Sequence, residues 1–477
     1  MFSRVSYILH TSAEHPLNKP FLQTERNLYD TDILESIQKD IAVWFENGFA
    51  QIYWSEDDIK EMHKESKKLL DIDQAKKIID GCREIYNLYW KVQREVIDSA
   101  KKPLTKREIA VLYDKYISVF RRLLWYFIAM GDKLTYAVEK DLEKILEEKL
   151  GRKAKEGYIS ITTPTDADLL HNELMDWRKV ITNPAHEMIL EHANKYSILL
   201  PNTFSHEDAL SWAKSRLGKK SLAEIEHEIL SADNRRKKVK ERQREIFSKL
   251  RSERAEELSS FIREITLIRL LLKSCWNGEA YHMLPFYERI AAIAGCSLKD
   301  LYMLYTREEI HNLLHKNINI TKEELEQRKK YCLLHLNNKK IRIYSGEEAL
   351  AMKKKIIDPS LPKKEIKSFR GNIANMGKVV GPVKVIKTDT PSVMEKIARE
   401  LTPEHILVAG MTNPAMIVLI KKVKGIITDE GGIACHAAII SREMGVPCII
   451  GTKLATSILK DGEIVELDAD RGIITRL

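Results

Sequence analysis

The chain has 477 residues, of which 44% are hydrophobic and 31% are charged. This length exceeds one ordinary hydrophobic core, so two or three domains are expected, and the composition is that of a globular protein and excludes a disordered chain. The formal charge of +9 is spread through the sequence. Its densest piece, residues 235–254, mixes Glu with Lys and Arg without aromatic interleaving, which predicts a solvated helix face and no nucleic-acid partner.

Membrane and disulfide chemistry are not indicated. The longest apolar runs, near residues 123–130 and 265–272, are far too short to span a bilayer. The N-terminus, MFSRVSYILHTSAEHP, lacks a sustained apolar core and a small-residue cleavage site. Six cysteines are scattered without a C-x-x-C pair, which predicts neither a disulfide framework nor a zinc site. We therefore expect a cytoplasmic location and no membrane partner.

The first 357 residues have the pattern of a mainly α-helical domain. Apolar residues recur at three- and four-residue spacing among Lys and Glu, as on the buried stripe of a helix. The predicted helical segments are residues 57–70, 73–99, 106–150, 209–216, 221–272 and 321–336. No repeat of fixed period is present, so a single helical domain with one sizeable core is favoured over a solenoid.

Two histidines of this region, His311 and His315, are four residues apart and could meet on one face of a helix. Glu308 lies one turn before His311. Because no further ligand is in view, ordinary packing is favoured over a metal site, and we predict no metal site in the chain.

A change of texture marks a domain boundary. Residues 358–369, DPSLPKKEIKSF, contain two prolines, three lysines and no helical stripe, which predicts a linker. From residue 370 to 477, glycine-punctuated strands alternate with helices, so this region is predicted to be an α/β domain. The strands are predicted at 378–386, 405–409, 424–428, 447–450, 463–467 and 472–476, and the helices at 390–400 and 413–422.

Within this domain, residues 428–452 read TDEGGIACHAAIISREMGVPCIIGT, a strand end followed by a glycine turn and a helix. Gly431 and Gly432 permit positive φ and close approach of a bulky ligand, and the free amides of a helix N-terminus form an anion site. His436 lies in the first turn of that helix. An imidazole of near-neutral pKa is partly unprotonated and nucleophilic, which suggests a phosphoryl group carried on His436 itself. The alternative is a satisfied core histidine on an apolar helix.

The motif GG-x-x-C-H-A-A-I-I-x-R-E-x-G-x-P resembles the phosphohistidine signature of the phosphoenolpyruvate-utilising enzymes, which include phosphoenolpyruvate synthase, pyruvate phosphate dikinase, rifampicin phosphotransferase and phenylphosphate synthase. The resemblance implies a swivelling phosphohistidine domain over 370–477, with His436 as the phosphorylated residue. It assigns phosphate binding and support to Gly431, Gly432, Ala434, Cys435 and Arg442. Many members have Thr where this chain has Ala434, so a hydroxyl that could orient the histidine is missing there.

Other segments resemble the same family. GNIANMGKVVGPVKVI is similar to its opening strand pair, VAGMTNPAM to its Met-Thr-x-Pro turn, and GEIVELDADRGII to its closing hairpin. Residues 163–177, 192–200 and 297–314 more weakly resemble its helical regions. In rifampicin phosphotransferase such a region binds the phosphate acceptor, so the resemblance implies a candidate acceptor site in residues 1–357.

Family members that phosphorylate this histidine from ATP use an ATP-grasp domain, and we find neither room nor a glycine-rich phosphate loop for one. The phosphoenolpyruvate-binding barrel is not found either. We therefore expect a phosphotransferase component that depends on an ATP-grasp partner in trans, with Mg²⁺ and ATP on that partner and a small-molecule acceptor in the helical domain. Two alternatives remain: a binding protein regulated by phosphorylation of His436, and a degenerate scaffold.

Overall fold

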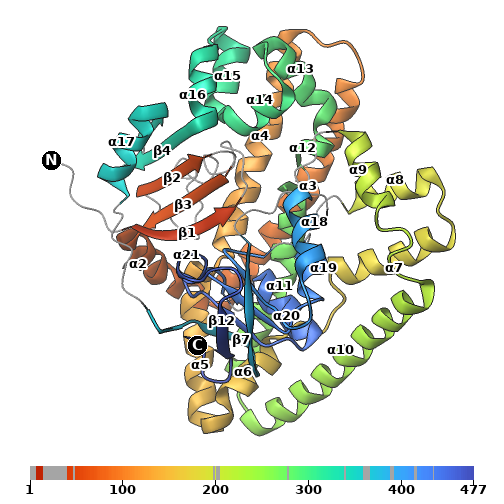
Figure 1. Cartoon of the computed structure of the whole chain (residues 1–477), viewed down its shortest axis with the longest axis vertical. Coiled ribbons are helices and arrows are strands. Elements are labelled where there is room, and N and C mark those ends of the chain that lie inside the picture. Colours follow the sequence, from red (N-terminus) through yellow and green to blue (C-terminus); the bar gives the residue numbers. More distant parts are fainter. Residues whose placement is uncertain are drawn as a thin grey trace.

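The structure is a computed structural model that describes residues 7–13, 40–46, 49–196, 199, 205–276, 279–337, 340–357, 366–386, 391–412, 416–432 and 435–477. A mainly helical N-terminal part is followed by a C-terminal part built on a sheet, which confirms the predicted fold class (Figure 1). Most of the predicted linker, 358–365, lies outside the described residues. Ile357 packs in a core cluster of the N-terminal part and Phe369 in one of the C-terminal part. The boundaries at 357 and 370 stay predictions.

The helical part is organised around long amphipathic helices. These are α3 (Ile72–Ala100), α4 (Lys106–Ala129), α5 (Asp132–Leu150), α10 (Leu222–Leu250) and α11 (Glu253–Trp276). The predicted segments 106–150 and 221–272 are each split in two. Gly131 precedes α5 as its N-cap, and Arg251 ends α10 in the left-handed conformation, with φ of 44°. A residue in the left-handed conformation ends a helix because the amides that follow it no longer form the i to i−4 hydrogen bonds of the helix.

Capping residues mark several helix starts. Thr105 and Ser221 each form a reciprocal capping box with the Glu three residues later. The further helices of this part are α2 (Glu56–Glu65), α6 (Ala154–Thr162), α7 (Leu169–Thr182), α8 (His186–Lys195), α9 (His206–Lys214), α12 (Glu279–His282), α13 (Leu284–Ala294), α14 (Leu298–Leu304), α15 (Arg307–Lys316), α16 (Lys322–Lys330) and α17 (Gly346–Ile356).

The N-terminal part also contains an antiparallel sheet that the helical pattern does not predict. Its strands are β1 (Tyr7–Ala13), β2 (Asp40–Glu46), β3 (Phe49–Ser55), β4 (Tyr331–Asn337) and β5 (Lys340–Ser345), in the order β1-β3-β2-β4-β5. The predicted helix over 321–336 is wrong beyond residue 330, where α16 ends and β4 begins. The reason is burial: β4 is a central strand with a continuous apolar run, and such a short run has no periodicity that separates strand from helix.

A fully buried polar network lies inside the helical core. The carboxylate of Glu279 accepts hydrogen bonds from Tyr116 and Tyr287 at 2.7 Å each and from Arg307 Nη2 at 3.0 Å. Tyr302 donates to its other oxygen at 3.2 Å. Both side chains of the Glu279–Arg307 ion pair are 0% exposed. Removing one partner of such a pair leaves an uncompensated charge in the core, so the network makes the α12–α15 region sensitive to substitution.

The C-terminal sheet has eight strands in the order β6-β13-β12-β8-β9-β10-β11-β7. The strands are β6 (Ser368–Arg370), β7 (Asn372–Asn375), β8 (Lys378–Ile386), β9 (Ile406–Ala409), β10 (Gly425–Thr428), β11 (Cys448–Ile450), β12 (Ile464–Asp468) and β13 (Ile473–Arg476). The helices are α18 (Pro391–Glu400), α19 (Ile417–Ile420), α20 (His436–Met444) and α21 (Ala455–Ile458). Strands β8, β9, β10 and β11 run parallel, and the others pair antiparallel.

The parallel strands are buried on both faces. Along β9, Ile406 and Val408 belong to one core cluster, whereas Leu407 and Ala409 belong to the cluster on the opposite face. This period of two is the geometry of a strand between two covering layers. The face with Leu407 also includes Ala437 and Ala438, so it is the face that α20 covers.

The two parts are packed together in this conformation. In Figure 1 the C-terminal part lies beside α5, α6, α7, α10 and α11. Leu170 of α7 packs against the core cluster that contains Ala437 and Ala438. Lys421, just after α19, forms an ion pair of 2.9 Å with Glu228 of α10. Through these contacts α20, the helix that begins at His436, packs against the helical part, and we call this arrangement the docked conformation.

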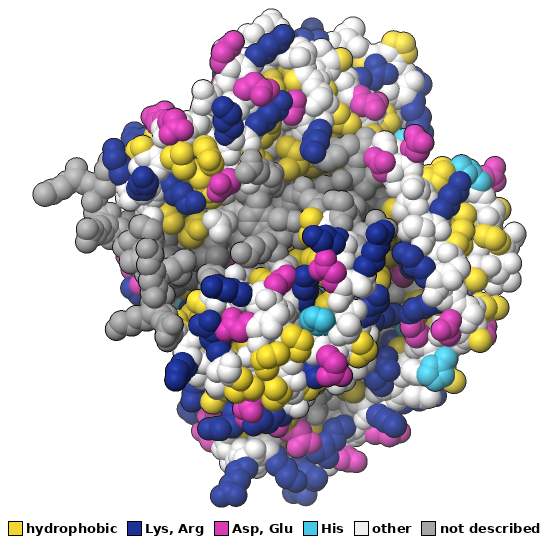
Figure 2. Space-filling model, viewed as in Figure 1, with side chains coloured by type: hydrophobic (Ala, Val, Ile, Leu, Met, Phe, Trp, Pro, Cys, Tyr) yellow, Lys and Arg dark blue, Asp and Glu magenta, His cyan; other side chains and the backbone are white. Residues whose placement is uncertain are grey.

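The surface charge is mixed. On the face drawn in Figure 2, Lys and Arg side chains lie among Asp and Glu side chains, as expected for a net charge spread over a long chain. Among the helices that the structure describes, none has the length and apolar character needed to cross a bilayer.

Candidate functional site

The candidate site lies where two neighbouring parallel strands end. Strand β9 ends at Ala409 and β10 at Thr428, and these two residues are paired in the sheet. The loop after β9 contains Thr412, and the loop after β10 leads to His436 at the start of α20. Because the carboxyl ends of parallel strands meet at one edge of a sheet, residues far apart in sequence converge there.

His436 is anchored through one ring nitrogen. Its Nδ1 lies 2.9 Å from the hydroxyl oxygen of Thr412, which is itself buried. Its Nε2 is buried and has no hydrogen-bond partner among the described residues. The tautomer with the proton on Nδ1 donates to Thr412 and leaves the lone pair on Nε2. The contact with Thr412 orients the ring through Nδ1, and Nε2 is the nitrogen without a hydrogen-bond partner among the described residues.

Burial of the His436 side chain favours its neutral form. The side chain is buried at the contact between the two parts of the molecule, and burial lowers the pKa of His436 well below its ordinary value. The positive charge of Lys273 on α11 lowers it further. A neutral imidazole is the nucleophilic form, so burial at this contact favours the nucleophilic form of His436.

The turn before α20 is tightly folded. Gly431 has φ of +117°, and a Cβ at this position would lie 2.5 Å from Cys435 Sγ. The carbonyl of Gly432 accepts from the Cys435 amide at 2.9 Å. Cys435 is the N-cap of α20, and its Sγ accepts from the Ala438 amide at 3.4 Å. Burial raises the pKa of Cys435, which fits a packing and capping residue rather than a nucleophile.

Arg442 and Glu443 face the helical part from the later turns of α20. Arg442 Nε donates to the carbonyl of Ala374 at 2.9 Å, while its buried Nη2 has no hydrogen-bond partner in the part of the chain that the structure describes. Burial and the charge of Asp168 on the helical side raise the pKa of Glu443 to about 8. Arg235, Arg236 and Lys421 act in the opposite direction.

A small cavity adjoins these two side chains. Its volume is about 50 Å³, and it lies between α20 and the helical part, with Asp168, Arg235, Arg236, Ile439, Arg442 and Glu443 among its lining residues. Pockets that hold small-molecule ligands are typically about 300–1,000 Å³. In this conformation this cavity, as lined by the described residues, therefore has space for a few water molecules but not for a typical ligand.

Asp429 fastens the loop that follows the next strand. Its carboxylate accepts from the hydroxyl of Thr452 at 2.9 Å and from the hydroxyl and amide of Thr456. Burial raises the pKa of Asp429, and these hydrogen bonds oppose the rise. These hydrogen bonds connect the end of β10 to the start of α21. They stabilise the edge of the sheet from which the histidine loop extends.

The structure brings together only part of the residue set predicted from sequence. Gly431, Cys435 and His436 form one turn, while Arg442 lies farther along α20. Ala434 lies outside the described residues. The sequence analysis did not assign Thr412 to the site. It did identify the Met-Thr-x-Pro turn that contains Thr412, and that turn could have indicated a site residue. A hydroxyl from the neighbouring loop thus contacts the histidine ring.

Comparison with known proteins supports the predicted resemblance of the C-terminal part to phosphoenolpyruvate-utilising enzymes. Residues 401–472 match the family model described as "PEP-utilising enzyme, mobile domain". A probable phosphoenolpyruvate synthase of Archaeoglobus fulgidus is 46% identical over 106 residues, which are 22% of this chain and 13% of that protein. The phosphoenolpyruvate synthase of Aeropyrum pernix is 36% identical over 132 residues, 28% of this chain and 15% of that protein.

A third relative is an uncharacterised phosphotransferase of Bacillus subtilis, 32% identical over 182 residues, which are 37% of this chain and 21% of that protein. The chain therefore spans 13–21% of the length of these three relatives. The family model, by contrast, includes β9, β10, the glycine turn and α20, the elements that build the candidate site. Within the C-terminal part, residues 401–472 are therefore similar to the mobile domain of the phosphoenolpyruvate-utilising enzymes.

Proposed function

We propose that the chain is a phosphotransferase component in which Nε2 of His436 receives a phosphoryl group and passes it to a small-molecule acceptor held by the helical part. The observation that carries the proposal is the pairing of Nδ1 with Thr412, which leaves the other nitrogen without a hydrogen-bond partner among the described residues. Similarity to the mobile-domain family supports a role in phosphoryl transfer.

The chemistry is a pair of displacements at phosphorus. The Nε2 lone pair forms a bond to phosphorus while the bond to the leaving oxygen of the donor breaks. An acceptor oxygen then forms the new bond to phosphorus, the P–N bond breaks, and the imidazole recovers its neutral form. Dividing one transfer into two through a covalent intermediate is nucleophilic catalysis. The buried Nη2 of Arg442 and the glycine turn are the proposed sources of charge stabilisation.

Burial of the histidine supports movement of the domain. In the docked conformation Nε2 of His436 is buried against the helical part, where a separate donor protein has no access to it. The domain would leave this position to be phosphorylated and return to deliver the group. The segment 358–369 is the predicted hinge of that movement.

The phosphoryl donor is proposed to be an ATP-grasp protein acting in trans, with Mg²⁺ bound together with its ATP. The segments shared with the phosphoenolpyruvate synthases cover 13% and 15% of those proteins, so the match leaves most of the length of each relative without a counterpart. The residues of this chain have the task of holding and presenting the imidazole, while Mg²⁺ would neutralise charge on the nucleotide.

A regulatory role is the competing proposal. The cavity of about 50 Å³ beside α20 lacks the space of a ligand pocket, and a phosphoryl group on a buried nitrogen would disturb the docked packing. Phosphorylation would then release the domain from the helical part and change which surfaces are available. In that case no small molecule would receive the phosphate.

The test is labelling of the purified chain with ATP that carries label in its β- or γ-phosphate. With Mg²⁺ alone the chain is expected to stay unlabelled, and addition of a candidate ATP-grasp partner is expected to label it. The label should be lost in mild acid, since phosphoramidates are acid-labile, and should be absent from His436→Ala. The matched control is His405→Gln, a histidine of the same domain. Label that survives acid or persists in His436→Ala would contradict the proposal.

A second measurement separates the phosphotransferase from the regulatory protein. The labelled chain is incubated with pools of small molecules, and loss of label to a low-molecular-weight product supports the enzyme. Shortening the segment 358–369 should slow this loss more than it slows labelling, because a partner in solution can approach His436 from many directions whereas the helical part is reached through the hinge. Stable label with every pool, together with a phosphorylation-dependent change in shape, would favour regulation.

A further inference from the structure

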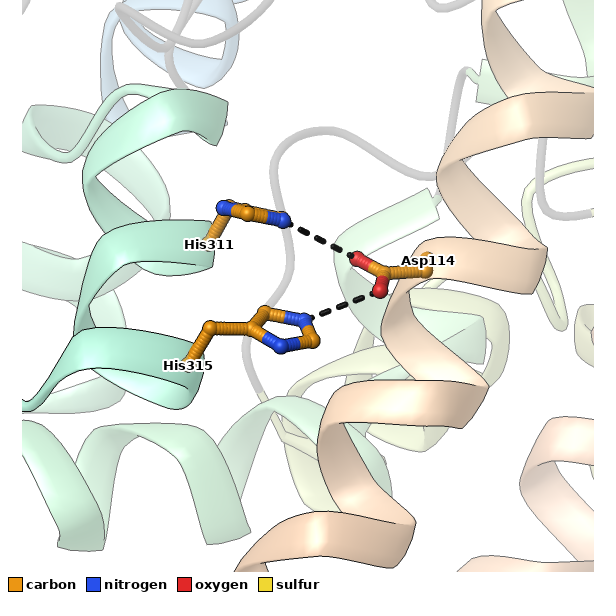
Figure 3. A group of neighbouring side chains, drawn as sticks. All are labelled: Asp114, His311 and His315. Atoms are coloured by element: carbon orange, nitrogen blue, oxygen red, sulfur yellow. Dashed lines mark ion pairs between the residues drawn. The ribbon is translucent and has the colours of Figure 1, made fainter.

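A cluster of three side chains of types that can ligate a metal lies on the helical part, apart from the candidate site around His436. His311 and His315 project from one face of α15, and Asp114 projects toward them from α4 (Figure 3). His315 Nε2 lies 2.9 Å from one carboxylate oxygen of Asp114, and His311 Nε2 lies 3.9 Å from the other. The two imidazole rings are stacked with their centroids 4.2 Å apart. The third ligand that the sequence pattern did not provide comes from a different helix.

The spacing of these groups fits one ion. One donor atom from each residue can be chosen so that all three lie within 4.8 Å of one another. Donor atoms around a tetrahedral ion at about 2.0–2.1 Å lie roughly 3.3 Å apart, so small side-chain rotations close the difference. The side chains of His311, His315 and Asp114 are 46%, 34% and 44% exposed, which leaves room for these rotations and for water ligands.

The backbone positions of the ligands are held by the buried network. Tyr113, the neighbour of Asp114, donates from its hydroxyl to the carbonyl of Arg307 at 3.2 Å. Arg307 is one turn before His311 on α15 and is fixed by its ion pair with Glu279. The register between α4 and α15 is therefore set without a metal, and the three donors meet on fixed elements rather than on a loop.

We propose that Asp114, His311 and His315 bind one divalent transition-metal ion, with Zn²⁺ as the ion that best suits the ligand set. Two imidazoles and one carboxylate are ligands typical of Zn²⁺ sites with an open position, whereas Mg²⁺ prefers oxygen ligands only. The ion would cross-link α4 to α15 on the outside of the helical core. The site does not depend on the proposed phosphoryl transfer at His436.

The test is metal titration of the full chain, prepared without a histidine tag and freed of metal by chelation. We expect one Zn²⁺ per chain by calorimetry, and with Co²⁺ a visible absorption band typical of nitrogen and oxygen ligands without a thiolate charge-transfer band. The single variants His311→Ala, His315→Ala and Asp114→Ala should each weaken binding by at least about tenfold. His186→Ala, an exposed histidine on α8, should bind as the parent chain does, and Mg²⁺ should not compete.

A thermal measurement tests the cross-link independently. Zn²⁺ should raise the Tm of the parent chain and of His186→Ala but not that of the three ligand variants, because an ion that binds only the folded state stabilises it by mass action. All three ligands are partly exposed, so far-UV circular dichroism should show the variants folded. Binding weaker than about 1 mM, or equal binding in parent and ligand variants, would overturn the proposal.

Discussion

Nδ1 of His436 lies 2.9 Å from the hydroxyl of Thr412, and the two residues come from loops that follow the neighbouring parallel strands β10 and β9. The hydroxyl orients the ring, and Nε2 is buried without a hydrogen-bond partner among the described residues. Thr412 belongs to the Met-Thr-x-Pro turn after β9, and its hydroxyl reaches a histidine that is 24 residues later in the sequence.

Replacement of Thr412 by Val is expected to slow phosphorylation of His436 by about fivefold, which corresponds to loss of one orienting hydrogen bond of ~1 kcal/mol. Val keeps the volume but cannot bond to Nδ1, so the ring can rotate and the tautomer is no longer selected. Thr412→Ser should retain most of the rate. Phosphorus NMR of the labelled parent chain should show the phosphoryl group on Nε2. Equal rates for Val and Ser, or phosphorylation on Nδ1, would contradict the role of Thr412.

Gly431→Ala should abolish labelling and destabilise the domain. The backbone φ of +117° is strained for any residue with a Cβ, and the added carbon would lie 2.5 Å from Cys435 Sγ. We expect a loss of roughly 1–3 kcal/mol in the free energy of unfolding. Gly445→Ala is the matched control, because Gly445 also has positive φ but has open space around its Cβ position. If both variants label equally, the turn does not shape the site.

Docking of the mobile domain should depend on pH in two opposite ways. The pKa of Glu443 is raised to about 8 from an ordinary 4.5 in the docked state, so its contribution is full below 4.5 and is lost as pH rises through 8. The pKa of His436 is lowered from 6.5, so its contribution is full above 6.5 and is lost as pH falls through the docked-state value. Docking should therefore be strongest in the mildly acidic range, with a docking constant that changes by up to about tenfold per pH unit on either side.

Small-angle scattering between pH 4 and 9, about the range of these pKa values, measures this dependence as the fraction of compact molecules. Glu443→Gln should remove the fall on the alkaline side, and His436→Gln should remove the fall on the acidic side. The charges of Asp168, Arg235, Arg236 and Lys421 act on Glu443 and set the midpoint of the alkaline fall. Asp168→Asn removes a repelling charge, so it should lower the pKa of Glu443 and move the alkaline fall to lower pH. A compact fraction that is the same at every pH would contradict the coupling.

Arg307→Met should lower the free energy of unfolding by about 3–5 kcal/mol, since it leaves the fully buried carboxylate of Glu279 without its counter-charge. The control is Arg242→Met, which removes an ion pair between Arg242 and Glu156 on the surface and should cost at most about 1 kcal/mol. Chemical denaturation monitored by circular dichroism measures both. Equal effects of the two substitutions would show that the buried network is not a stabilising centre of the helical part.

The sequence by itself determined the features that depend on local pattern. Most of the strands and helices beyond residue 370, the turn at Gly431 and the start of a helix near His436 follow from glycine positions, alternation and capping within a few residues of one another, whereas the short helix α21 was not predicted. Helix α3 and the helical character of residues 221–272 follow from three- and four-residue spacing in the same way, whereas the break between α10 and α11 does not. Such signals are short-range, so they can be read without knowledge of what packs against them.

Only the tertiary structure decided which distant residues meet. Strand β4 pairs with β2, which is about 295 residues earlier in the sequence. The segment is a strand rather than a helix because it is buried between β2 and β5 in the sheet. Thr412 reaches His436 through the pairing of β9 with β10, and Asp114 reaches the two histidines of α15 through the packing of α4. These contacts depend on how whole elements are arranged, and side-chain periodicity within one element contains no information about its partner.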